Sequence, residues 1–328
     1  MLQVYLLTRL VHKVTQTISV DIPPSLRYTS PVLVEITPNI FLVEGEKRGQ
    51  FPFSHSILIH DEVTVLIDTG CGIERLRRLK EQYPPQLIIN SHAHPDHIPG
   101  NWLFTGLPLL VPRQSFHYTG RIDNVSERFT ESKDLARLWR HYVRENTGFR
   151  DALPTDHYDE GHHFQFGSVE LVTIHSPGHT RDSYCFLEPR QEILFSFDMD
   201  LSPFGPWYGH PESDIDQFEA SIKRVRSLKP RVVVSSHMGI ITDSIDERFE
   251  AYQAVVAQRD ARILEFLSQE RSLEEMVDAP LVYNDYPFAQ ELLRQWDRNM
   301  VKKHLHRLKQ RDLVEKTEKG YARTSIKL

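Results

Sequence analysis

The segment His92-Ala93-His94-Pro95-Asp96-His97 is the densest histidine cluster in the chain. It directly follows residues 86–90, a short apolar run that predicts a buried strand. Alternate residues leaving a strand point the same way, so His92 and His94 can bind one cation. Asp96 and His97 follow in the turn and can face a second cation beside it. Imidazole and carboxylate groups suit zinc, iron or manganese.

Further ligand-type residues follow other predicted strands. His179, in Ser176-Pro177-Gly178-His179-Thr180, comes after the apolar run 169–175. Asp198 ends the run 193–198, and His237 follows the run 230–235. Folds that combine helices and sheets place their sites at the carboxyl ends of strands. This recurrence favours a built metal site over a surface loop that binds metal adventitiously.

The H-x-H-x-D-H segment, the Pro-Gly-His-Thr turn, the later Asp and the final His together resemble the metallo-β-lactamase superfamily, over roughly residues 30–245. The resemblance implies an α/β fold, an αββα sandwich, with a two-metal site between the sheets. It assigns one metal to His92, His94 and His179, a second metal to Asp96, His97 and His237, and a bridging position to Asp198. It also implies that Asp68, in Ile67-Asp68-Thr69-Gly70, orients the ligands.

One position departs from the family pattern. Relatives usually have Gly before the bridging Asp, whereas this chain has Phe197. Asp200, two residues further on, would face the same side as Asp198 and remains an alternative ligand. The two Cys of the chain, Cys71 and Cys185, occupy no ligand position. The resemblance is therefore closer to the glyoxalase II type than to true zinc β-lactamases, which generally use Cys where this chain has Asp198.

The expected chemistry is metal-dependent hydrolysis. Two divalent ions, zinc first and iron or manganese as alternatives, can share a bridging water and lower its pKa toward neutrality. The resulting hydroxide would attack a carbonyl carbon or a phosphorus, and Asp96 can accept its proton. Glyoxalase II relatives hydrolyse thioesters, lactones, phosphodiesters and RNA. Persulfide dioxygenases of the superfamily keep a similar signature with one iron, so oxygen chemistry remains an alternative.

Candidate substrate-binding residues lie near these motifs. Tyr208 and His210 belong to an aromatic stretch, residues 204–210, that closely follows Asp198 and could line the pocket. Their alternative role is packing in a loop that covers the sheet edge. His55 lies where relatives place a loop over the metals, and its alternative role is that of a hydrogen-bonded core histidine.

The periodicity of apolar residues predicts the surrounding elements. A hairpin is expected around Asp61-Glu62, a helix over residues 73–83 and another over residues 216–228. Residues 126–146 are predicted to form one helix, which is a lid candidate and lies inside a helical insertion at about 113–160. Residues 1–255 are assigned to the catalytic domain.

The remaining residues, 256–328, are assigned to a small winged-helix-like domain. Helices are expected over residues 246–267, 272–277 and 287–310, followed by a hairpin of residues 313–316 and 321–324. Residues 294–328 carry eleven Lys and Arg against four acidic residues, a net charge of +7, which leaves −13 for the rest of a chain whose total is −6. This basic region could bind RNA through phosphate contacts. Its alternative is a structural or dimerising module, so a homodimer is possible.

Length and composition narrow the class of protein. The chain has 328 residues, 17 of them His, and no apolar run of the roughly 18 residues that a membrane span needs. Residues 1–14 read as a structural N-terminus rather than a signal peptide, which fits a cytoplasmic location. The favoured function is hydrolysis of a small thioester, ester or lactone. The alternatives are an endoribonuclease or phosphodiesterase, and a nucleic-acid-binding regulator with a non-catalytic metal site.

Overall fold

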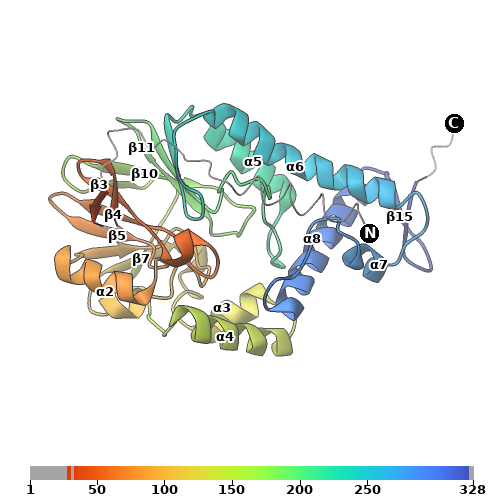
Figure 1. Cartoon of the computed structure of the whole chain (residues 1–328), viewed down its shortest axis with the longest axis horizontal. Helices are drawn as coiled ribbons and strands as arrows, with labels where there is room; N and C mark the ends of the chain where they lie inside the picture. The colour runs from red at the N-terminus through yellow and green to blue at the C-terminus, as the bar shows by residue number, and fades with distance from the viewer. Residues whose placement is uncertain (1–27, 31–32, 325–328) are drawn as a thin grey trace, which may run out of the picture.

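The computed structural model describes residues 28–30 and 33–324, so the predicted N-terminal segment 1–14 lies outside the described residues. Two β-sheets form the body of the molecule (Figure 1). The first sheet runs in sequence order through β1 (Tyr28–Ser30), β2 (Leu33–Thr37), β3 (Ile40–Val43), β4 (Ser56–His60), β5 (Thr64–Ile67), β6 (Leu87–Ile89), β7 (Leu109–Pro112) and β8 (Asp156–Tyr158). The second runs from β14 (Gly239–Ile241) through β13 (Val232–Ser235), β12 (Ile193–Phe197), β11 (Tyr184–Glu188) and β10 (Glu170–His175) to β9 (His163–Gln165).

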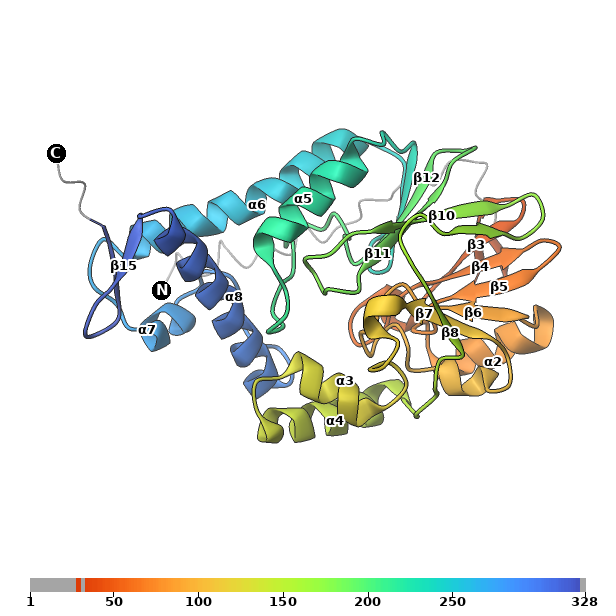
Figure 2. The same cartoon turned by 180° about the vertical axis from the view of Figure 1, so that it is seen from behind.

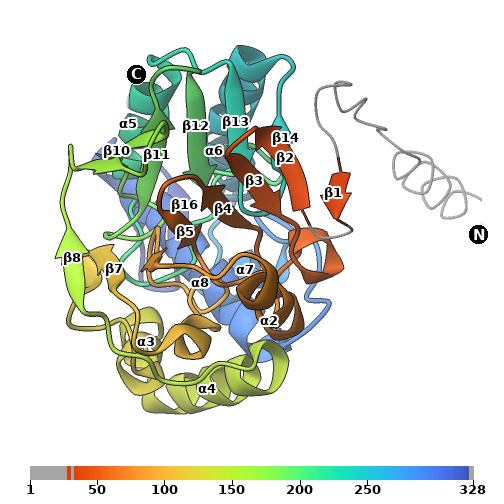
Figure 3. The same ribbon diagram turned by 90° about the vertical axis from the view of Figure 1, so that its left-hand side faces the viewer.

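The sheets pack face to face, with helices outside both. Ile57 and Ile67 of the first sheet share one buried cluster with Phe186 and Phe195 of the second. Helix α2 (Ile73–Gln82) covers the outer face of the first sheet (Figure 3). Helices α5 (Ile215–Arg226) and α6 (Ile245–Phe266) cover the outer face of the second. The predicted α/β class and the sandwich layers are confirmed.

Strand direction brings the ligand-type residues to one edge of the sandwich. Strands β5, β6 and β7 are parallel neighbours, and β12 and β13 are also parallel. Strand β6 leads into His92, while β12 and β13 lead into Asp198 and His237. The carboxyl ends of these strands therefore point toward the same edge, as the sequence motifs predicted.

The prediction of one helix over residues 126–146 is wrong. The structure has α3 (Ile122–Phe129) and α4 (Lys133–Thr147), separated by a short break. Thr130 is extended, and the Ser132 hydroxyl accepts a hydrogen bond from the amide of Leu135. Ser132 thus caps a new helix N-terminus, which the continuous apolar stripe concealed.

Helices α6, α7 and α8 and a β-hairpin form the last part of the chain that the structure describes. After α6 come α7 (Leu273–Asp278), α8 (Gln290–Gln310), β15 (Val314–Lys316) and β16 (Tyr321–Arg323). Ser272 and Glu275 form a capping box at the start of α7. Helix α8 begins beside α3 and α4 and runs toward the hairpin end of the molecule (Figure 2). Short 3-10 helices are η1 (Glu46–Gly49), η2 (Asn101–Phe104) and η3 (Arg113–Ser115).

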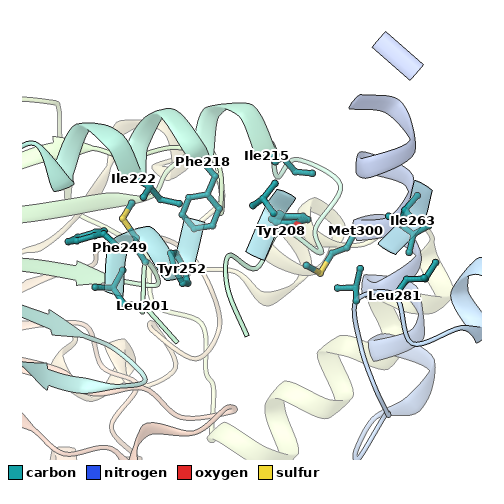
Figure 4. Packing of buried hydrophobic residues seen from close by; sticks show 14 of the residues in the cluster. Leu201, Tyr208, Ile215, Phe218, Ile222, Phe249, Tyr252, Ile263, Leu281 and Met300 are labelled. Carbon is teal, nitrogen blue, oxygen red and sulfur yellow. The ribbon is translucent and has the colours of Figure 1, made fainter. Parts of the chain in front are cut away.

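The apolar core continues from the second sheet into these last helices. Phe218 of α5, Tyr252 of α6 and Met300 of α8 belong to one buried cluster (Figure 4). Residue 255 lies within α6, which passes through this region without a break. The division of the chain at residue 255 stays a prediction, and α6 contributes to both sides of it.

Asp297 of α8 is a buried carboxyl with a pH-dependent effect on stability. Burial raises its pKa from 3.8 to about 6, because the hydrogen bond with Tyr286 Oη, at 2.7 Å, only partly opposes desolvation. The resulting stabilisation is complete below about pH 4 and is lost as the pH rises through 6. We expect Asp297→Asn to raise the free energy of unfolding by about 1–3 kcal/mol at pH 8. Urea unfolding of both proteins at pH 4 and pH 8 checks this, and an equal effect at the two pH values would contradict it.

In the part of the chain that the structure describes, no helix combines the length and apolar character needed to cross a bilayer.

Candidate metal centre

All seven predicted metal ligands meet at this edge of the sandwich. Two groups of candidate ligand atoms form there, each within 4.8 Å of one another, and Asp198 belongs to both. The first group is His92, His94, His179 and Asp198, and the second is Asp96, His97, Asp198 and His237. The structure therefore brings together every residue that the motifs singled out as a ligand.

The first group surrounds Oδ2 of Asp198. This oxygen lies 3.5 Å from Nε2 of His92 and 3.1 Å from Nε2 of His179. Nδ1 of His94 lies 3.8 Å from the same oxygen and 2.9 Å from Nε2 of His179. Four donor atoms thus converge on one point.

The second group surrounds Oδ1 of Asp198. This oxygen lies 2.8 Å from Nε2 of His97 and 3.5 Å from Nε2 of His237. Oδ2 of Asp96 lies 3.6 Å from the same nitrogen of His237 and 3.9 Å from that of His97. The two carboxylate oxygens of Asp198 therefore face different groups, which is the arrangement that a bridging ligand requires.

The spacing of the donors fits metal ions. Tetrahedral ligands at the usual metal distances of about 2.0–2.1 Å lie about 3.3 Å from one another. The distances from Asp198 to its neighbours fall around this value. In addition, Nε2 of His92 and Nε2 of His97 are buried, and within residues 33–324 neither makes a well-directed hydrogen bond, although the Asp198 carboxylate lies nearby. Buried polar atoms are rarely left without a partner, so these nitrogens suit a bound cation.

The charges of the two groups also suit cations. Burial lowers the pKa of His92, and lowers that of His94 to well below its usual range, which keeps both imidazoles neutral and able to bind metal. Burial would also lower the pKa of His237, but Asp198 and Asp96 raise it to about 9. Burial would raise the pKa of Asp198, but nearby histidines, His97 foremost, hold it well below the ordinary value. The second group thus attracts positive charge, which a metal ion would supply in place of protons.

Asp68 lies beneath the groups and holds the ligand segment. Its Oδ1 accepts a hydrogen bond from the amide of Ser91, at 2.8 Å. Its Oδ2 accepts from the Ser91 hydroxyl at 2.7 Å and pairs with Nδ1 of His97 at 2.8 Å. The Ser91 hydroxyl also lies 3.0 Å from Nδ1 of His92. A fully buried carboxylate therefore orients two ligand rings with Nε2 toward the metal groups.

Backbone carbonyls orient two other ligand rings. Nδ1 of His179 donates to the carbonyl of Trp207 at 2.9 Å, and Nδ1 of His237 donates to the carbonyl of Gly49 at 2.6 Å. Both bonds leave Nε2 free for the metal groups. Gly49 has φ +71° and its Cα faces the ring of His55, so a side chain there would collide with that ring. Sequence motifs gave no signal for these two carbonyl contacts, because they involve main-chain atoms.

The departure at Phe197 has a structural explanation. Phe197 has φ +48°, in the left-handed region that glycine adopts without cost. A phenylalanine there costs about 1–2 kcal/mol, and its buried ring packs against Phe186 in the core between the sheets. Asp198 thereby reaches both groups, whereas Asp200 accepts from the amide of Ser202 and belongs to neither.

A buried ion-pair network that the motifs did not reveal supports the ligand loop. Oδ2 of Asp182 accepts from the amide of Ala93, between His92 and His94, at 2.9 Å. Arg128 of α3 pairs with Asp182 at 2.5 Å and with Glu212 at 2.6 Å. Asp182 follows His179 by three residues, so its proximity to the turn was visible, but its partner on α3 was not.

Two of the three predicted substrate-binding residues lie elsewhere. Tyr208 is fully buried in the core (Figure 4). Its hydroxyl contacts Nε2 of His304 at 2.7 Å and Arg259 at 2.9 Å. His55 is also buried, and its Nδ1 accepts from the amide of Gly45. Burial is the main cause that lowers the pKa of His55 to about 4. The prediction that these two residues contact substrate is therefore corrected: both are core residues.

His210 does line a cavity over the metal groups. Its Nδ1 donates to the carbonyl of Phe129, and its ring lies 4.6 Å from that of His94. The cavity has a volume of about 580 Å³ and is lined by ligand residues of both groups, among them His94 and His237. Its remaining walls come from the loop before β4, from α4, from residues 200–210 and from α6 and α8.

Residues 49–237, more than half of the chain, match the metallo-beta-lactamase superfamily. The chain belongs to this superfamily. The match covers the whole of the seven-residue site, and relatives named as thioesterases and lactamase-like proteins agree with it. The prediction of a hydrolase is thereby confirmed.

Curated relatives are distant in sequence. A "beta-lactamase-like protein 2 homolog" of Caenorhabditis elegans is 22% identical over 82% of this chain and 84% of its own length. An "atrochrysone carboxyl ACP thioesterase" of Pseudocercospora fijiensis is 23% identical over 74% of this chain, which spans 64% of that protein's length.

Solved structures share the fold. A metallo-beta-lactamase family protein of Thermus thermophilus, TTHA1429, superposes with a TM-score of 0.67 at 19% identity, over 88% of this chain and all of that one. A beta-lactamase domain protein of Burkholderia ambifaria gives 0.68 at 16% identity, over 92% and 96% of the two chains. At these identities the likeness concerns the fold alone.

Proposed function

We propose that this metallo-beta-lactamase superfamily hydrolase is a di-metal enzyme that cleaves a small thioester, ester or lactone. The observation that carries the proposal is the pair of ligand groups that share Asp198 at the base of one cavity. When bound there, two divalent cations, zinc first and iron or manganese as alternatives, would supply Lewis acidity to water and to the scissile carbonyl.

The chain's own residues would position the reactants. Asp96 is nearly buried and lines the cavity, so its carboxylate is placed to take a proton from the attacking water. His210 lines the cavity beside His94 with its Nδ1 proton held by Phe129, which leaves Nε2 as an acceptor for a substrate group. Asp68 would keep the ligand rings in place without contacting substrate.

The thioesterase names among the relatives support the thioester part of this proposal. Several fungal relatives are named as atrochrysone carboxyl ACP thioesterases, at 22–23% identity. These names describe those proteins. For this chain they single out thioesters as the first substrates to assay.

Metal analysis and a substrate panel test the proposal. The purified protein, expressed with zinc, iron and manganese supplied, should hold close to two transition-metal ions per chain. The panel compares S-lactoylglutathione, p-nitrophenyl acetate and bis-p-nitrophenyl phosphate. Turnover of thioester or ester is expected. A metal-free protein, or turnover of the phosphodiester alone, would overturn the proposal.

The C-terminal winged-helix-like region is proposed to wall the cavity rather than to bind RNA. Leu293 and Trp296 of α8 line the cavity. The basic side chains of α8 largely contact acidic groups of the same molecule. These pairs join Arg294 and Arg298 to Glu274, Lys302 to Glu131, and Arg307 to Asp216 and Glu219. Paired in this way, they are less available for phosphate contacts than their number suggests.

Charge reversal tests this reading of the basic region. In the double variant Lys302→Glu and Lys303→Glu, we expect ester or thioester turnover within about twofold of the parent, because neither residue lines the cavity. Single-stranded RNA should not bind the parent saturably at about 150 mM salt, where phosphate contacts are screened. RNA binding that weakens steeply with salt and is lost in the double variant would instead favour an endoribonuclease.

A further inference from the structure

The cavity over the metal groups has aromatic walls, which bear on the substrate. The rings come from segments far apart in the sequence: Phe51 before β4, Trp139 of α4, Trp207 after β12, Tyr252 of α6, Tyr283 after α7 and Trp296 of α8. Volumes of about 300–1,000 Å³ with predominantly apolar walls are typical of sites that enclose most of a drug-sized ligand. At about 580 Å³, this cavity is far larger than an acetyl or lactoyl group needs.

Away from the metal groups, the cavity walls lack positive charge. Within residues 33–324, no Lys or Arg lines the cavity. The polar side chains away from the metal groups are uncharged or acidic: Gln50, Ser202, Asn284, His210, Tyr252 and Tyr283, together with the carboxylates of Asp200 and Asp285. A phosphate or carboxylate placed among them would lose its hydration without gaining an ionic partner, and the two carboxylates would repel it.

The aromatic wall is held rigidly. The indole Nε1 of Trp207 donates to the Tyr283 hydroxyl at 2.6 Å. The rings of Trp207 and Trp296 lie nearly perpendicular, with centroids 5.5 Å apart. Gly209 allows this contact, because a Cβ there would lie 2.7 Å from Trp207 and 2.8 Å from Trp296. A preformed wall of this kind can bind a rigid ring with little loss of side-chain conformational entropy, because its own side chains are already ordered.

The same wall reaches the metal groups. The Trp207 ring lies 5.5 Å from that of His179 and 6.0 Å from that of His94. At the other end, Phe51 meets Trp296 edge-on at 6.1 Å and stacks on Phe288 at 5.6 Å. A ligand along this wall would therefore extend from the ligand residues to the outer rim.

We propose that the acyl group of the substrate is bulky, uncharged and ring-containing, and that it lies against the wall formed by Trp207, Trp296 and Phe51. The inference rests on the proposed function and specifies the acyl group of its small-molecule substrate. In the reaction, water adds its oxygen to the acyl carbon and the bond from that carbon to sulfur or oxygen breaks. A carboxylic acid and a thiol or alcohol are released, and the leaving group takes the second proton of water.

Matched esters test the charge and size preference. With zinc-loaded protein, kcat/KM is measured for p-nitrophenyl 2-naphthoate and acetate, and for p-nitrophenyl 4-methylbenzoate and the terephthalate monoester. Each value is divided by the rate constant for spontaneous hydrolysis by hydroxide. We expect the naphthoate to exceed the acetate by at least about 30-fold. The neutral methylbenzoate should exceed the anionic terephthalate by at least about 10-fold. Equal values within either pair would overturn the inference.

Binding of a neutral amide separates this inference from the proposed function. Calorimetric titration should show 2-naphthamide binding at least about 30-fold more tightly than acetamide. Trp296→Ala should weaken naphthamide binding by at least about 10-fold. Trp102→Ala is the matched control, because Trp102 lies in η2 and does not line the cavity. Thermal unfolding of both variants verifies their folding.

The hydrolysis and binding experiments distinguish failure of the proposed function from failure of the aromatic substrate class. Naphthamide binding that depends on Trp296, without turnover of any ester or thioester, would overturn the proposed function and leave the apolar site standing. Turnover of acetyl and lactoyl esters without naphthamide binding would overturn the aromatic substrate class alone. Equal weakening of naphthamide binding by Trp296→Ala and Trp102→Ala would also overturn the aromatic substrate class, because the wall would then have no specific role in binding.

Discussion

Replacing Asp198 by alanine is expected to lower kcat/KM for ester or thioester hydrolysis by at least about 10³-fold. Its two carboxylate oxygens face different ligand groups, so one substitution removes a ligand from both. The Lewis acidity of two cations contributes several kcal/mol to such reactions, which corresponds to a rate change of this size. Elemental analysis should show fewer than one metal ion per chain. His94→Ala, which removes a ligand from the first group alone, should abolish turnover and retain one ion.

Asp200→Asn is the matched control for this prediction. Asp200 lies two residues from Asp198 and lines the same cavity, but it belongs to neither ligand group. The control variant should keep two metal ions per chain. Metal loss in Asp200→Asn combined with full metal content in Asp198→Ala would exchange the roles of the two carboxylates. Undiminished turnover in both Asp198→Ala and His94→Ala would show that the site is misassigned.

Replacing Asp68 by alanine is the second large effect that we expect. The carboxylate is fully buried and holds Ser91 and His97, so its loss leaves their donors without an acceptor. Removing groups that orient metal ligands typically costs 10–100-fold in metal affinity. We expect that loss, together with about 2–4 kcal/mol of folding stability. Competition with a chelator of known affinity and urea unfolding measure the two effects.

Two further variants separate the effect on metal affinity from the effect on folding stability. Asp68→Asn can still accept from Ser91 through its amide oxygen, but its NH₂ group opposes the Nδ1 proton of His97, so an intermediate loss is expected. Asp61→Ala removes a carboxylate that accepts from the amide and hydroxyl of Ser168, in a turn away from the metal groups. It should reduce stability and leave metal affinity unchanged. Equal metal affinity in Asp68→Ala and the parent would mean that Asp68 stabilises the fold without orienting the metal ligands.

The candidate metal centre was predicted from sequence because its ligands lie close to strand ends. His92 and His94 lie three and five residues after the end of β6, and Asp198 directly follows β12. Parallel neighbours then carry their carboxyl ends to the same edge. The ligand set could therefore be identified from short motifs, although Asp68, Asp182 and Arg128 from other segments hold the ligand loop in place.

Helix boundaries and substrate contacts were harder to predict from the sequence. The apolar stripe of residues 126–146 continues across the break at Ser132, so periodicity alone did not reveal two helices. Tyr208 and His210 are two residues apart in one loop, yet only His210 reaches the cavity. Their directions depend on α6 and α8, whose Arg259 and His304 bind the Tyr208 hydroxyl. Such long-range contacts leave no mark in the loop itself.

The sequence by itself determined the superfamily, the two-sheet architecture and the candidate metal ligands, because strand periodicity and short motifs are local properties. Only the tertiary structure decided what surrounds them. It paired the basic residues of α8 with acidic partners, and it gathered Phe51, Trp207 and Trp296 into one uncharged wall. The physical reason is that a cavity's shape and charge depend on which distant segments pack together, and that packing is fixed by the whole core rather than by any one motif.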